Sequence, residues 1–540
     1  MFEYFLGLDC STQSLTAFLI DFNSKMIIDR HSINYDRDLP QYHTKNGIIV
    51  SNNEKEIHSD PLMWIEALDI LFANMKKKEI QLHEIKAISG SGQQHGTVYL
   101  NEKFEKKLQN LSPNELIVNQ INDCFTRKSS PIWMDSSTSK QCEEIRRTLG
   151  GMKETIKLTG SNTFERFSGP QIRKFYQEHP EEYKKTSIIH LVSSYMASVL
   201  LGKNAPIDHG DGSGMNLMNI ETKQWDSRAL EATAPSLKEK LPLLSNSYDA
   251  IGNISPYFIE KYGFNPETLL VAWSGDNPNS LIGTGLIGKG KAAISLGTSD
   301  TYFGYLKKLL LDLTGEGHVF GAPTGDYMSL ICYKNGSLAR ERIREKFGLN
   351  WGEFSRILNT IPPGNYGKII LPYFYPEIVP LVLEPKVYRF GMEETDLEGN
   401  IRAIIECQFL SMRLHSGWIK EKPEEIYATG GASVNKDILQ VAADIFNTKL
   451  RMFKITNSAA LGAALRSAKS YYDYIKSNKN WDQIINDFVK FQQTDLILPN
   501  IKYKELYDMM LELYRKCEEF VLNKGKNPES FRRKFIKKYF

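Results

Sequence analysis

The chain has 540 residues, which is too long for a single hydrophobic core, so two domains are expected. Hydrophobic residues make up 41% and charged residues 24%, as in an ordinary soluble globular protein. The formal net charge of +3 is too small to suggest a nucleic-acid partner, which requires a clustered basic surface.

The cysteines and the N-terminus favour a reduced, cytoplasmic setting. None of the six cysteines forms a Cys-x-x-Cys pair, and a chain of this length does not need disulfides. The first nine residues lack the basic segment and cleavage site of a signal peptide. The longest charge-poor stretch, 188–202, is shorter than the roughly 20 residues of a membrane span. We therefore expect a buried helix there and no membrane association.

A predicted β-hairpin opens the chain. Residues 4–9 and 15–21 are apolar runs on either side of a polar turn at 10–14. Such a turn presents backbone N–H groups and hydroxyls on one side, which suits phosphate oxygens. Asp9 at the strand end is well placed to hold Mg²⁺ through water, because magnesium prefers carboxylates together with substrate phosphates. An ordinary hairpin turn rich in Ser and Thr explains the same residues equally well.

A helix and a strand come next. Asp60 can cap a helix that begins at Pro61, because apolar residues at 62, 65, 68, 72 and 75 fall on one face. Residues 85–89 are a predicted strand that a Gly-Ser-Gly loop follows, and the polar stretch 101–128 is expected to be an irregular surface insertion.

The residues that follow the strand at 85–89 carry side chains that suit a sugar. Gln93, Gln94 and His95 gather amide and imidazole groups that can bind hydroxyls, although a solvated loop would have the same composition. Arg166, taken alone, is better explained by a surface ion pair.

Asp276 is the candidate for proton transfer. Residues 269–273 are a predicted strand, and Pro278 can begin a helix, so Asp276 follows the carboxyl end of a strand. Active sites of open α/β sheets gather at that edge. A carboxylate there can orient a hydroxyl and accept its proton during phosphoryl transfer. The alternative is an aspartate that only caps the helix.

The second half of the chain repeats the opening pattern. Residues 291–295 are a predicted strand, Gly297 and Thr298 lie in a polar turn, and 301–306 run extended again. A strand, a turn rich in Thr and a second strand thus occur near residue 10 and near residue 297. The repeat suggests a duplicated domain with a cleft between the copies, and the second turn offers a second phosphate site.

A glycine turn at 430–431 separates a predicted strand from a predicted helix. Missing side chains at Gly430 and Gly431 allow a nucleotide to approach the backbone, and the helix start favours anions. The stretch 283–288 matches G-x-G-x-x-G, but it comes at a helix end before a strand, which is the reverse of the dinucleotide-binding context. The strongest helical segment of the last seventy residues is 503–522.

Together these segments resemble the FGGY family of carbohydrate kinases, and within it the eukaryotic branch that acts on xylulose. The likeness extends from about residue 4 to about residue 470. The matching stretches, in chain order, are LGLDCSTQS, SGSGQQHG, WMDSSTS, ERFSGPQI, DGSGMNL, SGDNPNSL, ISLGTSDT, YKNGSL and ATGGASVN. Many family members have glycine at the position of Ser11, and serine there is a mark of the eukaryotic branch.

The resemblance implies an α/β fold with two RNase H-like, actin-like ATPase domains around a central cleft. It implies an N-terminal sugar-binding domain at 1–285 and a C-terminal nucleotide-binding domain at 286–470. Residues 471–540 are then a mainly helical tail. The implied partners are a ketose and ATP, with no nucleic acid and no membrane, and the protein is a monomer or a homodimer.

The resemblance also implies the reaction and its residues. The reaction is ATP-dependent phosphorylation of D-xylulose to D-xylulose 5-phosphate, with Asp276 as the general base. The implied sugar contacts are His95, Arg166, Asp276 and Asn277. The implied ATP contacts are Thr12, Gly297, Thr298, Trp351, Gly431, Ala432 and Asn435. Asp9 holds Mg²⁺ through water.

Two alternatives remain at this point. One is another kinase of the same family that acts on ribulose, gluconate or glycerol. The other is an actin-like or chaperone-like ATPase, which shares the phosphate turns but has no reason to keep SGQQHG or SGDNP.

Overall fold

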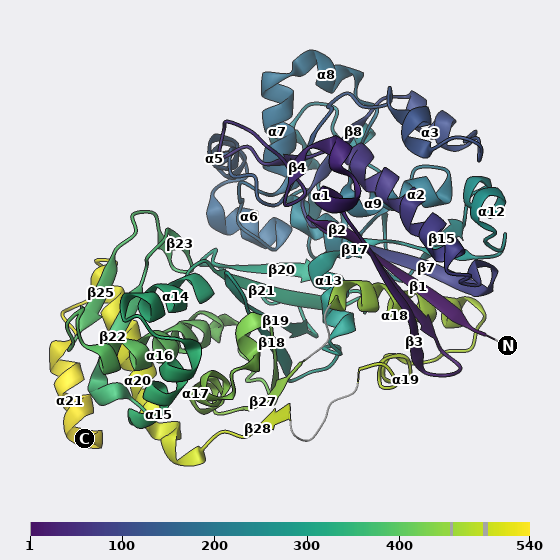
Figure 1. Cartoon of the computed structure of the whole chain (residues 1–540). Coiled ribbons are helices and arrows are strands. Elements are labelled where there is room, and N and C mark those ends of the chain that lie inside the picture. The colour runs from purple at the N-terminus through teal and green to yellow at the C-terminus, as the bar shows by residue number, and fades with distance from the viewer. Residues whose placement is uncertain (1, 454–456, 490–494) are drawn as a thin grey trace.

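The computed structural model describes residues 2–453, 457–489 and 495–540, which form two lobes around two seven-stranded sheets (Figure 1). The first sheet has the order β15-β16-β7-β1-β2-β3, and β17 pairs with β7. Its strands are β1 (Tyr4–Cys10), β2 (Ser14–Asp21), β3 (Met26–Asn34), β7 (Ile85–Gly92), β15 (Ala250–Asn253), β16 (Leu269–Val271) and β17 (Ser274–Gly275).

The second sheet has the order β20-β21-β19-β18-β26-β27-β28. Its strands are β18 (Lys291–Leu296), β19 (Asp300–Leu306), β20 (Gly317–Gly321), β21 (Tyr327–Tyr333), β26 (Glu425–Thr429), β27 (Lys449–Met452) and β28 (Leu496–Ile497). The predicted hairpins at the start of each half are therefore confirmed.

The two sheets repeat one topology, which confirms the predicted duplication. In the first sheet β1, β2 and β3 form an antiparallel meander, and β7 and β16 add parallel strands beyond β1. In the second sheet β18, β19 and β21 have the same antiparallel order, although β20 lies between β19 and β21 in sequence, and β26 and β27 add parallel strands beyond β18. Each polar turn thus joins the first two strands of its own sheet.

Helices cover both faces of the first sheet. The helix predicted to begin at Pro61 is confirmed as α2 (Pro61–Lys77). Asp60 caps it as predicted, because its Oδ1 accepts a hydrogen bond from Leu62 N at 2.9 Å. Helix α2 packs with α9 (Val192–Leu201) on the face that carries Leu6 and Leu8. Phe5 points to the opposite face, as the two-residue period of a strand requires, and packs there on α18 (Ser458–Tyr474).

Helix α18 lies late in the chain yet packs on the first sheet. Figure 1 shows it beside β1, and a Cβ atom on Gly7 of β1 would lie 2.0 Å from Ala460 O. Helix α18 also packs against α13 (Asp276–Gly283). The two helices approach closely because Gly283 has no side chain: a Cβ atom there would lie 1.9 Å from Ser458 O of α18. The C-terminal half of the chain therefore supports the lobe that carries Asp276.

In the core of the second lobe, several helices pack on the second sheet. One of them is α20, which confirms the helix predicted at 503–522. These helices are α14 (Ser337–Lys346), α15 (Trp351–Thr360), α16 (Leu397–His415), α17 (Lys436–Phe446), α20 (Lys504–Val521) and α21 (Glu529–Tyr539). The peripheral helices of the first lobe include α3 (Lys103–Leu108), α4 (Ile117–Ile121), α5 (Ser139–Thr148), α6 (Met152–Thr159), α7 (Ser168–Glu178), α8 (Pro180–Lys185), α10 (His209–Gly212), α11 (Ser227–Thr233) and α12 (Pro256–Tyr262).

Two local predictions were wrong. Residues 101–128 are not an irregular insertion, because α3 and α4 each bury an apolar pair spaced four residues apart, Phe104 with Leu108 and Ile117 with Ile121. Residues 188–202 are not one helix. Residues 188–191 form strand β10 (Ile188–Leu191), which pairs with β8 (Thr97–Leu100), before α9 begins. In the described part of the chain, no helix has both the length and the apolar character needed to span a membrane.

Candidate active site

The register of the first sheet brings the predicted residues to one edge. Asp9 on β1 lies opposite Ser91 on β7, and Gly275 on β17 lies opposite Gly92. These strands are parallel, so their carboxyl ends meet at a single edge. Asp9, the Gln93–His95 segment and Asp276 therefore approach one another although they are up to 267 residues apart in sequence.

Asp276 begins α13 and is held by its neighbour Asn277. The backbone N–H of Asn277 donates to Asp276 Oδ1 at 2.9 Å, and Asn277 Nδ2 donates to Gln94 Oε1 at 2.8 Å. A Cβ atom on Gly275 would lie 2.4 Å from Gln94 Cγ, so only glycine allows this close packing. Burial raises the pKa of Asp276 to about 6, while the N–H groups of Asn277 and Gln94 oppose the rise.

Asp9 faces the same space. Burial, with the negative charge of Asp276 added, raises the pKa of Asp9 to about 7. Buried polar atoms in folded proteins nearly always have a hydrogen-bond partner. Around this edge, several buried side-chain atoms have none among the described residues: Asp9 Oδ1, Ser91 Oγ, Gln93 Nε2, Gln94 Nε2, Asp211 Oδ1 and Ser274 Oγ. This concentration of unused donors and acceptors is typical of a site that binds a polar ligand.

His95 is buried and neutral. Its Nδ1 lies 2.9 Å from Gly214 O, and because a carbonyl can only accept, Nδ1 carries the proton and Nε2 remains an acceptor. Burial and the charge of Arg166 lower the pKa of His95 to about 3. Its backbone φ of 72° is uncommon for a residue other than glycine, and such conformations cluster at functional sites.

Arg166 lies in the loop before α7, next to His95. Its guanidinium covers the rings of Phe164 and Phe167, with Cζ 5.4 and 5.8 Å from their centroids. The His95 ring lies 4.5 Å from the same Phe167 ring, so both residues share one aromatic wall. Nη2 of Arg166 donates to Nε2 of His318, on β20, at 3.2 Å.

The first polar turn is tight and carries Thr12 toward the Gln93 loop. Ser11 N and Ser11 Oγ both donate to Ser14 O, at 3.0 and 2.9 Å, which closes the turn. Thr12 Oγ1 donates to Gln93 Oε1 at 3.2 Å, and Trp133 Nε1 donates to Thr12 Oγ1 at 2.9 Å. The turn and the candidate sugar loop are therefore directly connected.

The second polar turn, with Gly297 and Thr298, is fixed by a buried ion pair. Arg340 on α14 donates to both carboxylate oxygens of Asp300, at 2.7 and 2.8 Å, and neither side chain is exposed. The backbone of α14 also reaches the turn, since Ser337 N donates to Gly297 O at 2.9 Å.

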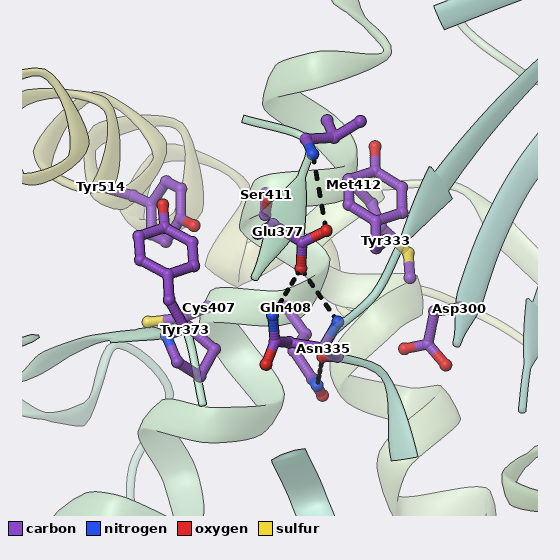
Figure 2. A pocket seen from close by; sticks show the side chains of 12 residues that line it. Asp300, Tyr333, Asn335, Tyr373, Glu377, Cys407, Gln408, Ser411, Met412 and Tyr514 are labelled. Atoms are coloured by element: carbon purple, nitrogen blue, oxygen red, sulfur yellow. Dashed lines mark hydrogen bonds between the residues drawn. The ribbon is translucent and has the colours of Figure 1, made fainter. Parts of the chain in front are cut away.

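A small cavity behind this turn is lined by the groups that hold it (Figure 2). Gln408 accepts from Arg340 at 2.8 Å and donates to Gly336 O at 2.9 Å. Glu377 accepts from the backbone and the side-chain nitrogen of Asn335, at 2.9 and 2.8 Å. These bonds anchor residues 334–336, between β21 and α14, beneath the turn and so restrain it.

The glycine turn at 430–431 lies beside the second phosphate turn. Gly430 has a φ of +87°, and a Cβ atom there would lie 2.6 Å from Leu296 O at the end of β18, so both its conformation and its packing require glycine. A Cβ on Gly431 would meet no protein atom within 4 Å, and Gly431 is exposed. The side of the turn at Gly431 is therefore open to a ligand.

Asn435 ties this turn to α15, which begins at Trp351. Asn435 Oδ1 caps α17, accepting from Asp437 N at 3.0 Å, and its Nδ2 donates to Ser355 Oγ on α15 at 2.7 Å. Trp351 lies one helical turn before Ser355 and is 39% exposed, with the Arg344 guanidinium 5.3 Å from its ring. An exposed indole beside an open glycine turn is suited to stack on an adenine ring.

The predicted residues thus form two groups, one on each lobe. His95, Arg166, Asp276, Asn277, Asp9 and Thr12 gather on the first lobe, and Gly297, Thr298, Trp351, Gly431, Ala432 and Asn435 gather on the second. Sequence reasoning missed Trp133, His318 and Ser355. Trp133 lies within the matched stretch WMDSSTS, so that motif held a usable signal, whereas His318 and Ser355 lie outside the matched stretches.

Comparisons with known proteins agree with this architecture. Models of the N-terminal and C-terminal domains of the FGGY family of carbohydrate kinases match residues 122–283 and 292–471. Among curated relatives, xylulose kinase of Rattus norvegicus is 38% identical over 97% of this chain and 98% of its own length. Xylulose kinase 2 of Arabidopsis thaliana is 43% identical over 86% of this chain and 87% of its own length.

Solved structures share the fold. The crystal structure of xylulose kinase from Rhodospirillum rubrum superposes with a TM-score of 0.82 at 16% identity, covering 96% of this chain and 99% of that one. Glycerol kinase of Plasmodium falciparum with ADP superposes with a TM-score of 0.77 at 17% identity, covering 95% and 97%. The two lobes are thus the two actin-like ATPase domains of such kinases. With both family domains matched and relatives aligned over almost its whole length, this chain belongs to the FGGY family of carbohydrate kinases.

Proposed function

We propose that the protein transfers the γ-phosphoryl group of ATP to D-xylulose, giving D-xylulose 5-phosphate. The curated relatives named xylulose kinases support this substrate, since they align with most of the chain. The observation that carries the proposal is the half-buried carboxylate of Asp276, at a sheet edge that also holds His95 and unused polar groups.

Asp276 is the proposed general base. A base works best when its pKa lies near the working pH, because it is then ionised yet basic enough to take a proton. With a pKa of about 6, Asp276 is mainly ionised at neutral pH. Its Oδ1 is occupied by Asn277, which holds the carboxylate in one orientation for the terminal hydroxyl of the sugar.

The sugar is proposed to contact His95, Arg166, Asp276 and Asn277. These residues offer complementary groups: a neutral imidazole acceptor at Nε2, a guanidinium donor, a carboxylate acceptor and an amide. The mixture suits a ligand whose hydroxyls each donate and accept.

ATP is proposed to bind Thr12, Gly297, Thr298, Trp351, Gly431, Ala432 and Asn435. The two turns would hold the phosphates through backbone N–H groups, and the open glycine turn with Trp351 would hold the adenosine. A magnesium ion fits Asp9, because its buried Oδ1 has no partner among the described residues and a cation there would offset the cost of burying the carboxylate charge. Bound there, the ion would neutralise charge on the transferring phosphates.

Within the described residues, no cluster of three or more His, Cys, Asp or Glu side chains could hold a metal ion. The protein would therefore hold magnesium together with the ATP phosphates, as is usual for this ion. We assign sugar binding to 1–285 and nucleotide binding to 286–470, with 471–540 as a C-terminal tail. We further infer a cytoplasmic enzyme that acts as a monomer or a homodimer.

The test is ADP release by the purified protein with ATP and Mg²⁺, in the presence of D-xylulose, D-ribulose, gluconate, glycerol or no acceptor. We expect release with D-xylulose to exceed that with every other acceptor, and mass spectrometry to find a pentulose monophosphate. Preference for another acceptor would assign the protein to another branch of the family. Equal release without acceptor would indicate an ATPase.

A further inference from the structure

Strand β20 of the second lobe reaches the candidate sugar site on the first lobe. It is an edge strand of its sheet, yet its outer edge is covered: Val319 N donates to Gly160 O at 3.1 Å, and Gly321 N donates to Ser213 Oγ at 3.0 Å. Figure 1 shows β20 extending toward β17 and α13. The position of β20 relative to the first lobe is therefore fixed by hydrogen bonds.

The alternation of side chains along β20 places His318 on the side that faces the first lobe. Val319 packs in the core of the second lobe, whereas Phe320 packs with Phe167 of the first. His318 shares the face of Phe320, and their rings stack with centroids 5.8 Å apart and planes 11° apart. His318 also lies against Phe164 and Phe167, at 4.7 and 5.4 Å.

The bond between Arg166 and His318 has only one possible direction. Arginine has donors and no acceptor, so Nε2 of His318 accepts from Nη2 of Arg166, and the neutral imidazole carries its proton on Nδ1. Burial, followed by the positive charge of Arg166, lowers the pKa of His318 well below its usual value, which keeps the ring neutral.

Arg166 has no other fixed polar partner in the part of the chain that the structure describes. Its guanidinium rests on two phenylalanine rings, which restrain its plane but leave it able to slide and rotate. The single hydrogen bond to His318 removes that freedom. An arginine side chain that is ordered before the ligand arrives loses less conformational freedom on binding.

We propose that His318 is a positioning residue, contributed by the nucleotide lobe, that fixes the Arg166 guanidinium for sugar binding. The proposal rests on the sugar role given to Arg166 under the proposed function. Under this proposal both lobes contribute residues to the sugar site: Arg166 comes from the first lobe and His318 from the second. The residue acts through Arg166, so its loss should weaken sugar binding and leave the nucleotide unaffected.

The test compares His318→Phe, which keeps the ring stacking but removes the acceptor, with His318→Gln, whose Oε1 places an acceptor near the position of Nε2. We expect His318→Phe to raise KM and the calorimetric Kd for D-xylulose about tenfold, which corresponds to about 1.4 kcal/mol. Its kcat and its KM for ATP should stay within about twofold of wild type. His318→Gln should recover most of the sugar affinity.

A double-mutant cycle separates positioning from general destabilisation. In an Arg166→Ala background, His318→Phe should have no further effect on the sugar, because the group that it positions is absent. His190→Phe is the matched control: His190 is also buried and neutral, but it bonds to Ser194 and Asn204 away from the site. It should leave KM for the sugar unchanged.

Three results would overturn the proposal: an unchanged KM for the sugar in His318→Phe, equal losses in His318→Phe and His318→Gln, or additive effects in the cycle. Failure of the proposed function is recognised separately, because wild type itself would then prefer another acceptor. The same comparison would be made with that acceptor.

Discussion

Replacing Asp276 with Asn should separate catalysis from folding. Asn keeps the shape of the side chain and an oxygen that can accept from Asn277, so the local hydrogen bonds survive. It cannot accept the proton of the sugar hydroxyl. General-base catalysis is worth about 10²–10⁴-fold, so kcat should fall by about that factor while the Kd for ATP stays close to wild type.

The same change should make the protein more stable. Ionising a carboxyl whose pKa is about 6 rather than 3.8 costs about 3 kcal/mol at neutral pH, because each pKa unit corresponds to about 1.4 kcal/mol. The neutral amide avoids this cost, so urea denaturation at pH 7.5 should show a gain of about 1–3 kcal/mol. A gain in stability together with a loss of turnover is expected when a functional group is kept in an unfavourable environment.

The assays are coupled ADP release with D-xylulose, calorimetric titration with ATP, and urea denaturation. Asp482→Asn is the control, because Asp482 is exposed on α19 (Trp481–Ile485), outside the site. It should change none of the three measurements. Near-normal kcat in Asp276→Asn would remove this residue from the chemistry, and a large loss of stability would show that its charge supports the fold instead.

Three other predictions follow from the same geometry. His95→Ala should raise KM for D-xylulose by about tenfold and leave that for ATP unchanged, since a lost hydrogen bond in a buried site costs about 1–3 kcal/mol; equal weakening of both would indicate a structural role. The kcat/KM for the sugar should fall as pH drops through about 6, because Asp276 then carries a proton; a flat profile from pH 7.5 to 5 would exclude it as base. Burial alone would lower the pKa of His415, but Glu316 and Glu518, at 2.7 and 3.1 Å, raise it to about 10. The ion pairs of protonated His415 therefore stabilise the fold fully below pH 6.5, and this contribution is lost as pH rises through 10. His415→Gln should lower stability by about 3–5 kcal/mol at pH 7, with a smaller difference from wild type at pH 10.5 in urea denaturation.

Much of the fold follows from local sequence patterns. The two hairpins are predictable because apolar runs flank polar turns, and α2 is predictable because Asp60, Pro61 and one apolar face agree. The close contact between α13 and α18 is not predictable in this way. It depends on Gly283 and Gly462, each of which lies where a Cβ would be 1.9 Å from a backbone oxygen of the other helix. Glycines 179 residues apart carry no local signal of their contact.

In the candidate site, too, some residues are predictable from local sequence patterns and others only from the assembled fold. Asp276, Gln94 and His95 follow strand ends, so their position at a common edge follows from strand order and direction. His318 was missed because a histidine in a short strand is locally ordinary. Its relevance depends on which strand reaches the other lobe and on the two-residue alternation along it, and both are properties of the assembled fold.

The junction between the lobes explains how a base on one lobe can be positioned reliably. Asp276 starts α13, and the fully buried Arg466 of α18 donates to Asn279 Oδ1 at 2.8 Å and to Ala272 O at 2.6 Å, on either side of that start. Helix α18 follows strand β27 of the second sheet in sequence, so the base rests on a segment that is made only after six of the seven strands of that sheet. A catalytic group must be held within a fraction of an ångström, and a helix held at both sides of its first residue provides that restraint. The first lobe therefore depends on the C-terminal half of the chain to position its catalytic group.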